Sequence, residues 1–107
     1  KEPLYIIKIN SSKNEIIVGP REKLGKKIIY LNNLNLLVDK SELKEKVFVK
    51  VRSSGKLLEA KIELKDRRAA KVHLKIPEDG ISPGQACVFY KQNEIGYKVL
   101  GGGWIEN

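Results

Sequence analysis

Apolar and polar residues alternate one by one along most of the chain. The clearest stretch is 47–52, VFVKVR, in which Phe48, Lys50 and Arg52 alternate with three valines. Because successive side chains of a strand point to opposite faces, the valines are expected to face a core and the other three residues to face outward. The same pattern, interrupted by turn-forming clusters, predicts further strands at residues 4–9, 15–19, 27–31, 58–64, 72–76, 86–90 and 97–100, with another extended piece at 104–105. On two of these strands the side chains expected to face the core are Leu58, Ala60, Ile62 and Leu64, and Val72, Leu74 and Ile76.

This spacing of strands predicts the fold class. Short strands with turn signals roughly every eight to twelve residues are typical of an all-β barrel or sandwich. No helices alternate with the strands, which argues against a parallel α/β sheet. The least regular region is 32–46, where Ser41 and Glu45 are compatible with one helical turn. We therefore expect a single domain over residues 1–107, a small antiparallel β-barrel of six to eight strands.

Composition narrows the class of protein. With 41% hydrophobic and 32% charged residues the chain is typical of a globular domain. No apolar run approaches the roughly 20 residues that span a bilayer, and no signal-peptide pattern opens the chain, so we expect no membrane association. The single cysteine allows no internal disulfide, which favours the cytoplasm. The absence of methionine suggests a piece of a longer protein.

Positive charge is concentrated in the middle of the chain. Residues 40–75 contain twelve Lys and Arg against five Asp and Glu, whereas the rest of the chain contains nine against eight. A basic segment of this kind suits a polyanion, because lysine and arginine displace counterions from nucleic-acid phosphates. The alternative is a lysine-rich surface that only keeps the protein soluble.

The segment GISPGQACVFY, residues 80–90, contains the only cysteine and raises the question of catalysis. Cys87 has no adjacent Lys, Arg or His to lower its pKa, so a small buried apolar residue is the favoured interpretation. His73, the only histidine, is predicted on an outward strand face between two lysines and has no metal-ligand cluster around it. GGGW at 101–104 lacks the features of a phosphate-binding loop and is interpreted as a bend where strands approach closely, with Trp104 packed over it. No nucleophile and base are placed together, so the chain alone is not expected to be an enzyme.

Two places on the predicted surface are candidates for RNA contact. Phe48, Lys50 and Arg52 share one face, which offers a ring for stacking and cations for phosphates. The alternative for Phe48 is a core position. Gln85 follows a Pro-Gly turn, and its amide can donate and accept hydrogen bonds to phosphate, ribose or base. The alternative for Gln85 is a structural hydrogen bond to the loop backbone.

Several motifs in order resemble a known family. LYIIKI and NEIIVGPREKL, then VKVR, GISPGQACVFY and VLGGGWIE, are similar to the C-terminal domain of the tRNA-specific 2-thiouridylases over essentially the whole chain. The resemblance implies a parent enzyme that adenylates the wobble uridine of tRNA with ATP and Mg²⁺ and then delivers sulfur from a cysteine persulfide. It also implies that the ATP-binding loop and both catalytic cysteines lie in an N-terminal catalytic region, preceding a central domain, and that Cys87 is not the persulfide carrier. The implied fold is a small barrel similar to the second-domain barrel of translation elongation factors.

The resemblance also implies site residues. The family's tRNA-contacting positions match Arg52, Ser53 and Gln85. Where family members have an Arg-Tyr-Arg-like run this chain has VRSSGK, so Ser53 replaces an aromatic residue and donates a neutral hydrogen bond in its place. Lys50 and Lys56 are expected as auxiliary RNA contacts. The rival hypothesis is a barrel that braces the catalytic domain, or docks a sulfur-relay protein, without touching RNA.

Overall fold

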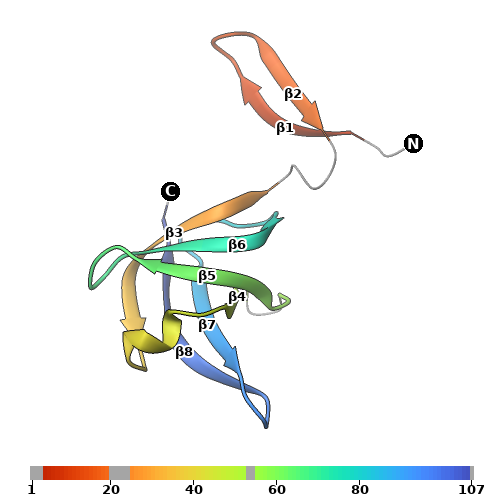
Figure 1. The fold of residues 1–107 in the computed structure, drawn as a ribbon. Helices are drawn as coiled ribbons and strands as arrows, with labels where there is room; N and C mark the ends of the chain where they lie inside the picture. Colours follow the sequence, from red (N-terminus) through yellow and green to blue (C-terminus); the bar gives the residue numbers. More distant parts are fainter. Residues whose placement is uncertain (1–3, 20–24, 53–54, 107) are drawn as a thin grey trace.

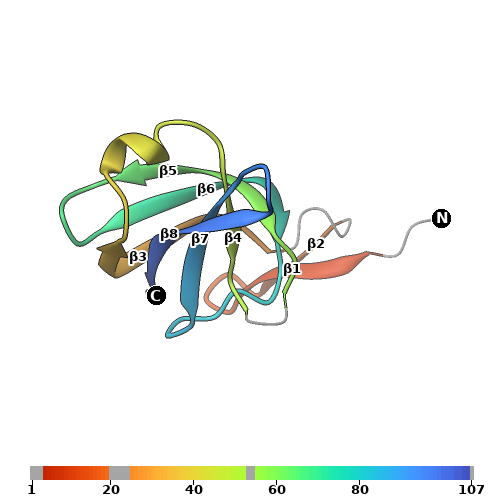
Figure 2. The same cartoon turned by 90° about the horizontal axis from the view of Figure 1, so that it is seen from below.

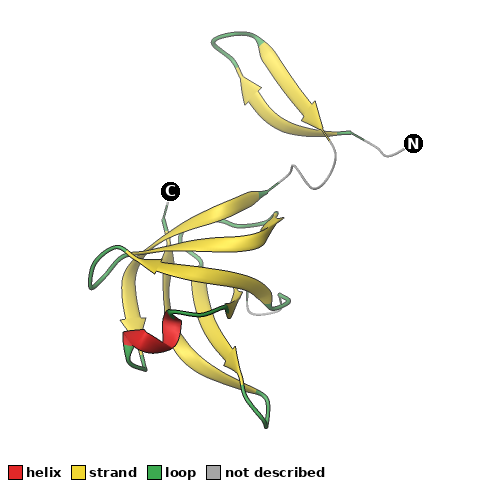
Figure 3. Ribbon diagram, viewed as in Figure 1, coloured by secondary structure: helices red, strands yellow, loops and turns green. Residues whose placement is uncertain are grey.

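The computed structural model describes residues 4–19, 25–52 and 55–106. Within these residues the chain forms eight strands and a turn of 3₁₀ helix (Figures 1 and 3). The all-β class predicted from the alternating pattern is confirmed. The elements are β1 (Tyr5–Asn10), β2 (Glu15–Gly19), β3 (Lys26–Leu36), η2 (Lys40–Leu43), β4 (Val47–Lys50), β5 (Leu58–Leu64), β6 (Ala70–Glu78), β7 (Ala86–Gln92) and β8 (Tyr97–Ile105).

Strands β3 to β8 close into an antiparallel barrel. Around the barrel the strands follow the order β3-β6-β5-β4-β7-β8, and β8 pairs back with β3 (Figure 2). Each strand therefore has a hydrogen-bonded neighbour on both sides, so the barrel has no free edge. The order also places β4 beside β7, with Phe48 opposite Tyr90 and Lys50 opposite Val88, although more than thirty residues separate the two strands in the sequence.

The barrel interior is filled by aliphatic side chains and one aromatic ring. The valines of β4 face inward as predicted. The buried core consists of Ile29, Leu31, Leu43, Val47, Val49, Val51, Ala60, Val72, Leu74, Cys87, Phe89, Leu100 and Ile105, with Leu58, Ile62 and Leu64 packed against it.

One prediction for β6 was wrong. Ile76 was expected to face the core with Val72 and Leu74, but 67% of its surface is exposed. The register of β3 and β6 explains the difference. Lys26 pairs with Glu78 and Ile28 pairs with His73, so one residue of β3 lies opposite four residues of β6. The extra residues bulge and reset the alternation of faces, so Ile76 points away from the interior.

Strands β1 and β2 form a separate two-stranded sheet (Figure 1). Their register places Ile6 opposite Val18 and Ile9 opposite Ile16, with a bulge between Ile6 and Lys8. These four aliphatic side chains share one face, and each is at least half exposed. An isolated hairpin is marginally stable at best, and an exposed apolar face of this kind is typical of a surface that another element covers.

The glycines of β8 let its two neighbours approach closely. A Cβ at Gly101 would overlap the carbonyl oxygen of Asn35 on β3, and one at Gly102 would overlap that of Cys87 on β7. The close approach of neighbouring strands at GGGW is therefore confirmed. Trp104 lies on the outside of the barrel with half of its surface exposed.

The least regular stretch of the sequence, 32–46, contains η2, which confirms the short helical turn expected near Ser41, but its first residues extend β3, which was predicted to end at 31, as far as Leu36. The Ser41 hydroxyl donates a hydrogen bond to the Asp39 carboxylate at 2.6 Å, and Leu43 packs into the core. None of the helices in the described part of the chain is long and apolar enough to cross a membrane.

Candidate nucleic-acid interface

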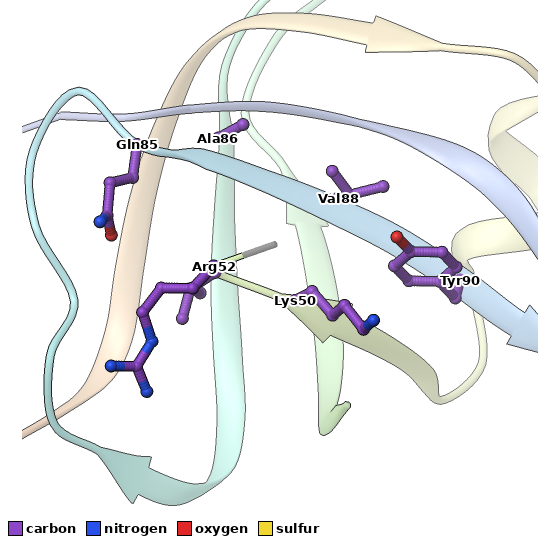
Figure 4. Close-up of a pocket in the computed structure, with 7 residues that line it drawn as sticks. Lys50, Arg52, Gln85, Ala86, Val88 and Tyr90 are labelled. Carbon is purple, nitrogen blue, oxygen red and sulfur yellow. The ribbon is translucent and has the colours of Figure 1, made fainter. Parts of the chain in front are cut away.

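A pocket of about 450 Å³ opens on the outside of the barrel where β4 and β7 lie side by side. Figure 4 shows Gln85 and Arg52 at one end of the pocket and Lys50 and Tyr90 at the other. The full lining is Lys50, Val51, Arg52, Gln85, Ala86, Val88 and Tyr90. The structure therefore brings Arg52, Gln85 and Lys50, all chosen from the sequence, to one site.

Gln85 enters the pocket from a turn whose backbone is fixed by β8. The amide N–H of Gly84 donates to the Ile105 carbonyl at 2.7 Å, and the Ile105 N–H donates to the Gln85 carbonyl at 2.8 Å. Gly84 has a φ of +87°, a conformation that glycine adopts without strain. The loop is thus held by main-chain groups.

The side-chain carbonyl oxygen of Gln85 is buried and has no hydrogen-bond partner in the described structure. A buried acceptor left unpaired costs roughly 1–3 kcal/mol, so such groups generally have a partner in the functional state of a protein. Among the described residues no loop group donates a hydrogen bond to this oxygen.

Arg52 lies just beyond the end of β4, and its side chain is 44% exposed. Its Nη2 is 3.6 Å from Oε2 of Glu78, and Nζ of Lys56 is 3.8 Å from Oε1 of the same carboxylate. Lys56 does not line the pocket but shares this carboxylate with Arg52. Ser53 lies outside the described residues, so its predicted role stays a prediction.

Lys50 and Tyr90 form the other end of the pocket because they project from the outer faces of paired strands. Sequence reasoning missed Tyr90, which reads as one more apolar residue of a buried strand. Phe48 does not line the pocket. Its ring packs edge-on against Tyr97 with centroids 5.9 Å apart, and Nζ of Lys46 lies 5.8 Å from the Phe48 centroid.

Cys87 is fully buried in the barrel interior, as the structural interpretation predicted. Burial raises the pKa of its thiol from the ordinary 9.0 to about 12, because the interior disfavours the charged thiolate. A thiol in this state does not act as a nucleophile at neutral pH.

His73 lies on β6 in contact with an acidic partner. Its Nε2 is 2.9 Å from Oε1 of Glu63, and Lys65 is 3.2 Å from the other oxygen of that carboxylate. The hydrogen bond to His73, followed by the contact with Lys65, lowers the pKa of Glu63 below its ordinary value. Among the described residues no group of three or more His, Cys, Asp and Glu side chains could hold a metal ion.

Comparison with known proteins gives two kinds of match. Residues 26–105 match the family model described as the aminomethyltransferase β-barrel domain, which covers β3 to β8. The tRNA-specific 2-thiouridylases MnmA of Cereibacter sphaeroides and Ruegeria pomeroyi are 41% and 39% identical to this chain over 107 residues, and that of Orientia tsutsugamushi is 44% identical over 106 residues. Each alignment covers 97% of this chain but only 28% of the relative. The resemblance drawn from the motifs is confirmed, and the chain spans little more than a quarter of the length of these relatives.

Proposed function

Because the chain belongs to the aminomethyltransferase β-barrel domain family, we propose that it is the tRNA-contacting C-terminal barrel of a tRNA-specific 2-thiouridylase. Its pocket between β4 and β7 binds tRNA and holds it for chemistry that takes place elsewhere in a longer polypeptide. The proposed setting is the cytoplasm, with tRNA and the remainder of the same polypeptide as partners.

The observation that carries this proposal is the unpaired side-chain oxygen of Gln85 in a pocket that Lys50 and Arg52 also line. RNA has hydrogen-bond donors for the Gln85 oxygen and negative charges for the two cations. A base N–H or a ribose 2′-hydroxyl can donate to Gln85, while phosphate oxygens accept from the two cations.

Tyr90 adds a third property of RNA-binding sites. Its ring lines the same pocket as Lys50, and aromatic rings on RNA-binding surfaces stack on unpaired bases. An acceptor, two cations and a ring together suit a nucleotide better than they suit a purely apolar protein segment.

The proposal assigns binding, not bond-making, to this chain. ATP with Mg²⁺ and the persulfide sulfur are used by the N-terminal catalytic region of the proposed enzyme, which lies outside these 107 residues. Cys87 takes no part, because its thiol is buried and its pKa is raised. The residues of this chain orient the tRNA relative to that catalytic part.

Titration of unmodified tRNA onto the full-length protein at several salt concentrations tests the proposal. Arg52→Ala is expected to weaken binding about tenfold and to reduce the slope of log K against log salt by about 1, because one phosphate contact is lost. Gln85→Ala is expected to weaken binding about tenfold with an unchanged slope, because the lost contact is uncharged.

Lys61→Ala is the matched control, since Lys61 is exposed on β5 and does not line the pocket. It is expected to change the affinity less than either pocket substitution. If neither Arg52→Ala nor Gln85→Ala weakens tRNA binding or thiolation, the pocket is not an RNA site.

A second candidate function is a brace that holds the catalytic part without touching RNA, or that docks a sulfur-relay protein. The exposed aliphatic face of the β1–β2 hairpin favours this candidate. It predicts that the pocket substitutions leave tRNA affinity and its salt dependence unchanged, whereas hairpin substitutions lower the stability of the full-length protein.

A further inference from the structure

Glu78 lies between the two cations that flank the β4–β5 turn. One oxygen of its carboxylate is 3.6 Å from Arg52 Nη2, and the other is 3.8 Å from Lys56 Nζ. The Glu78 side chain is only 11% exposed, whereas those of Arg52 and Lys56 are 44% and 75% exposed. A shielded carboxylate thus faces two cations that reach toward solvent.

The backbone around this contact keeps it in place. Glu78 is the last residue of β6 and is paired with Lys26 of β3. The amide of Gly55 donates to the Arg52 carbonyl at 3.0 Å, which closes the turn that carries both cations. Gly80 leaves room for the guanidinium, since a Cβ there would lie 2.8 Å from Arg52 Nη1.

The physical effect of such a contact is to reduce the freedom of long side chains before a ligand arrives. Immobilising one rotamer-rich side chain on binding costs about two- to tenfold in affinity, and prior ordering removes that cost. Glu78 engages one edge of the Arg52 guanidinium, which has five N–H donors, so others remain available to a phosphate.

We propose that Glu78 is a positioning residue that holds Arg52 at the β4–β7 pocket, and Lys56 beside Arg52, for the phosphates of a bound RNA. This inference rests on the proposed function of the pocket. It adds a residue that does not line the pocket and is itself negatively charged.

Because Glu78 is negatively charged, the direction in which its removal changes RNA affinity tests the inference. A carboxylate near a phosphate-binding site repels the phosphate, so removing its charge would tighten RNA binding if electrostatic attraction were all that mattered. If Glu78 acts by positioning, removing its charge weakens binding instead. The two explanations predict opposite changes.

The experiment is a titration of unmodified tRNA onto the full-length protein carrying Glu78→Gln, which keeps the shape of the side chain. We expect affinity to fall about three- to tenfold, in the range set by freeing one or two long side chains. Glu78→Asp, which keeps the charge but shortens its reach, is expected to lie between wild type and Glu78→Gln.

Glu42→Gln is the matched control. Glu42 pairs with Lys98 at 3.1 Å, and among the described residues neither of the two lines the pocket or forms an ion pair with Arg52 or Lys56. This substitution removes the same charge and is expected to leave RNA affinity unchanged or slightly higher. Thermal unfolding of each variant checks that the fold is retained.

A double-mutant cycle separates positioning from general stability. In the Arg52→Ala and Lys56→Ala double variant, adding Glu78→Gln is expected to cause no further loss of affinity, because no cations remain to be positioned. A full further loss in that background would contradict the inference.

The remaining outcomes are also distinguishable. If Arg52→Ala weakens binding but Glu78→Gln tightens it or leaves it unchanged, the positioning role is wrong and the RNA pocket stands. If Arg52→Ala itself has no effect, or the wild-type protein does not bind tRNA, the proposed function fails and this inference fails with it.

Discussion

Gln85 and Cys87 are two residues apart in the chain but have opposite surroundings. The turn before β7 directs Gln85 toward the outer pocket, whereas Cys87 occupies the first inward position of the strand. The polar residue is therefore the one placed for contact with a ligand. The thiol, which is the more reactive group in free solution, is shielded.

This placement predicts the reactivity of Cys87. With the pKa of its thiol raised to about 12, almost no thiolate exists in the folded protein at pH 8. We expect an aromatic disulfide reagent to modify native Cys87 on the order of a hundredfold more slowly than the unfolded chain, because the thiolate is the reacting form and the thiol is buried. The single cysteine of the 107 residues makes absorbance at pH 8, with and without denaturant, a direct measurement. Fast modification of the native chain would show that the thiol is accessible.

Sequence patterns singled out Arg52, Lys50 and Gln85, which line the pocket, but not Tyr90, which also lines it, or Glu78, which pairs with Arg52. Arg52 and Gln85 follow strand ends and turns, where local signals are strong. Tyr90 lines the pocket because β4 pairs with β7, and Glu78 contacts Arg52 because β6 ends beside the β4–β5 turn. Such pairings between distant segments leave no local signal in one sequence.

Among the elements, β8 differs from its predicted form at its glycines. The sequence suggested two short extended pieces separated by a glycine bend, whereas one strand runs from Tyr97 to Ile105. Glycine has a low strand propensity and no side chain to alternate, so the sequence pattern does not predict a strand over Gly101–Gly103. The neighbouring strands determine that glycine occupies positions 101 and 102, because their carbonyl groups fill the space that side chains would need.

We expect Gly102→Ala to destabilise the barrel by roughly 2–4 kcal/mol, because the added methyl group overlaps the Cys87 carbonyl and forces β7 and β8 apart. Gly96→Ala is the control, since a Cβ at Gly96 meets no atom within 4 Å and is expected to be nearly neutral. Urea unfolding of both variants measures the difference. Equal stabilities would mean that β8 does not need a glycine at this position.

At the scale of the whole molecule, the buried cluster that the structure describes lies in β3 to β8 and the segments joining them. Each of its residues falls between Ile29 and Ile105, and none of the hairpin side chains that are described belongs to it. The matched family model likewise begins at residue 26. The barrel and the hairpin therefore differ in what stabilises them.

Removal of residues 1–24 is expected to leave a barrel that unfolds cooperatively, with a melting temperature within about 5 °C of that of the full 107 residues. Circular dichroism during heating, with urea unfolding as a second probe, measures this. A truncated chain without a cooperative transition would show that the hairpin is needed for the barrel to fold.

Closure of the barrel has a thermodynamic consequence for the pocket. One wall of the pocket comes from β4 and the other from β7, so the pocket exists only while these strands are paired. The unfolded chain cannot present the same constellation of groups. Any molecule that fills the pocket therefore binds the native state alone and, by mass action, stabilises it by about 2.7 kcal/mol at a concentration a hundred times its Kd. The fraction of pockets that are occupied and the melting temperature of the barrel are therefore expected to rise together.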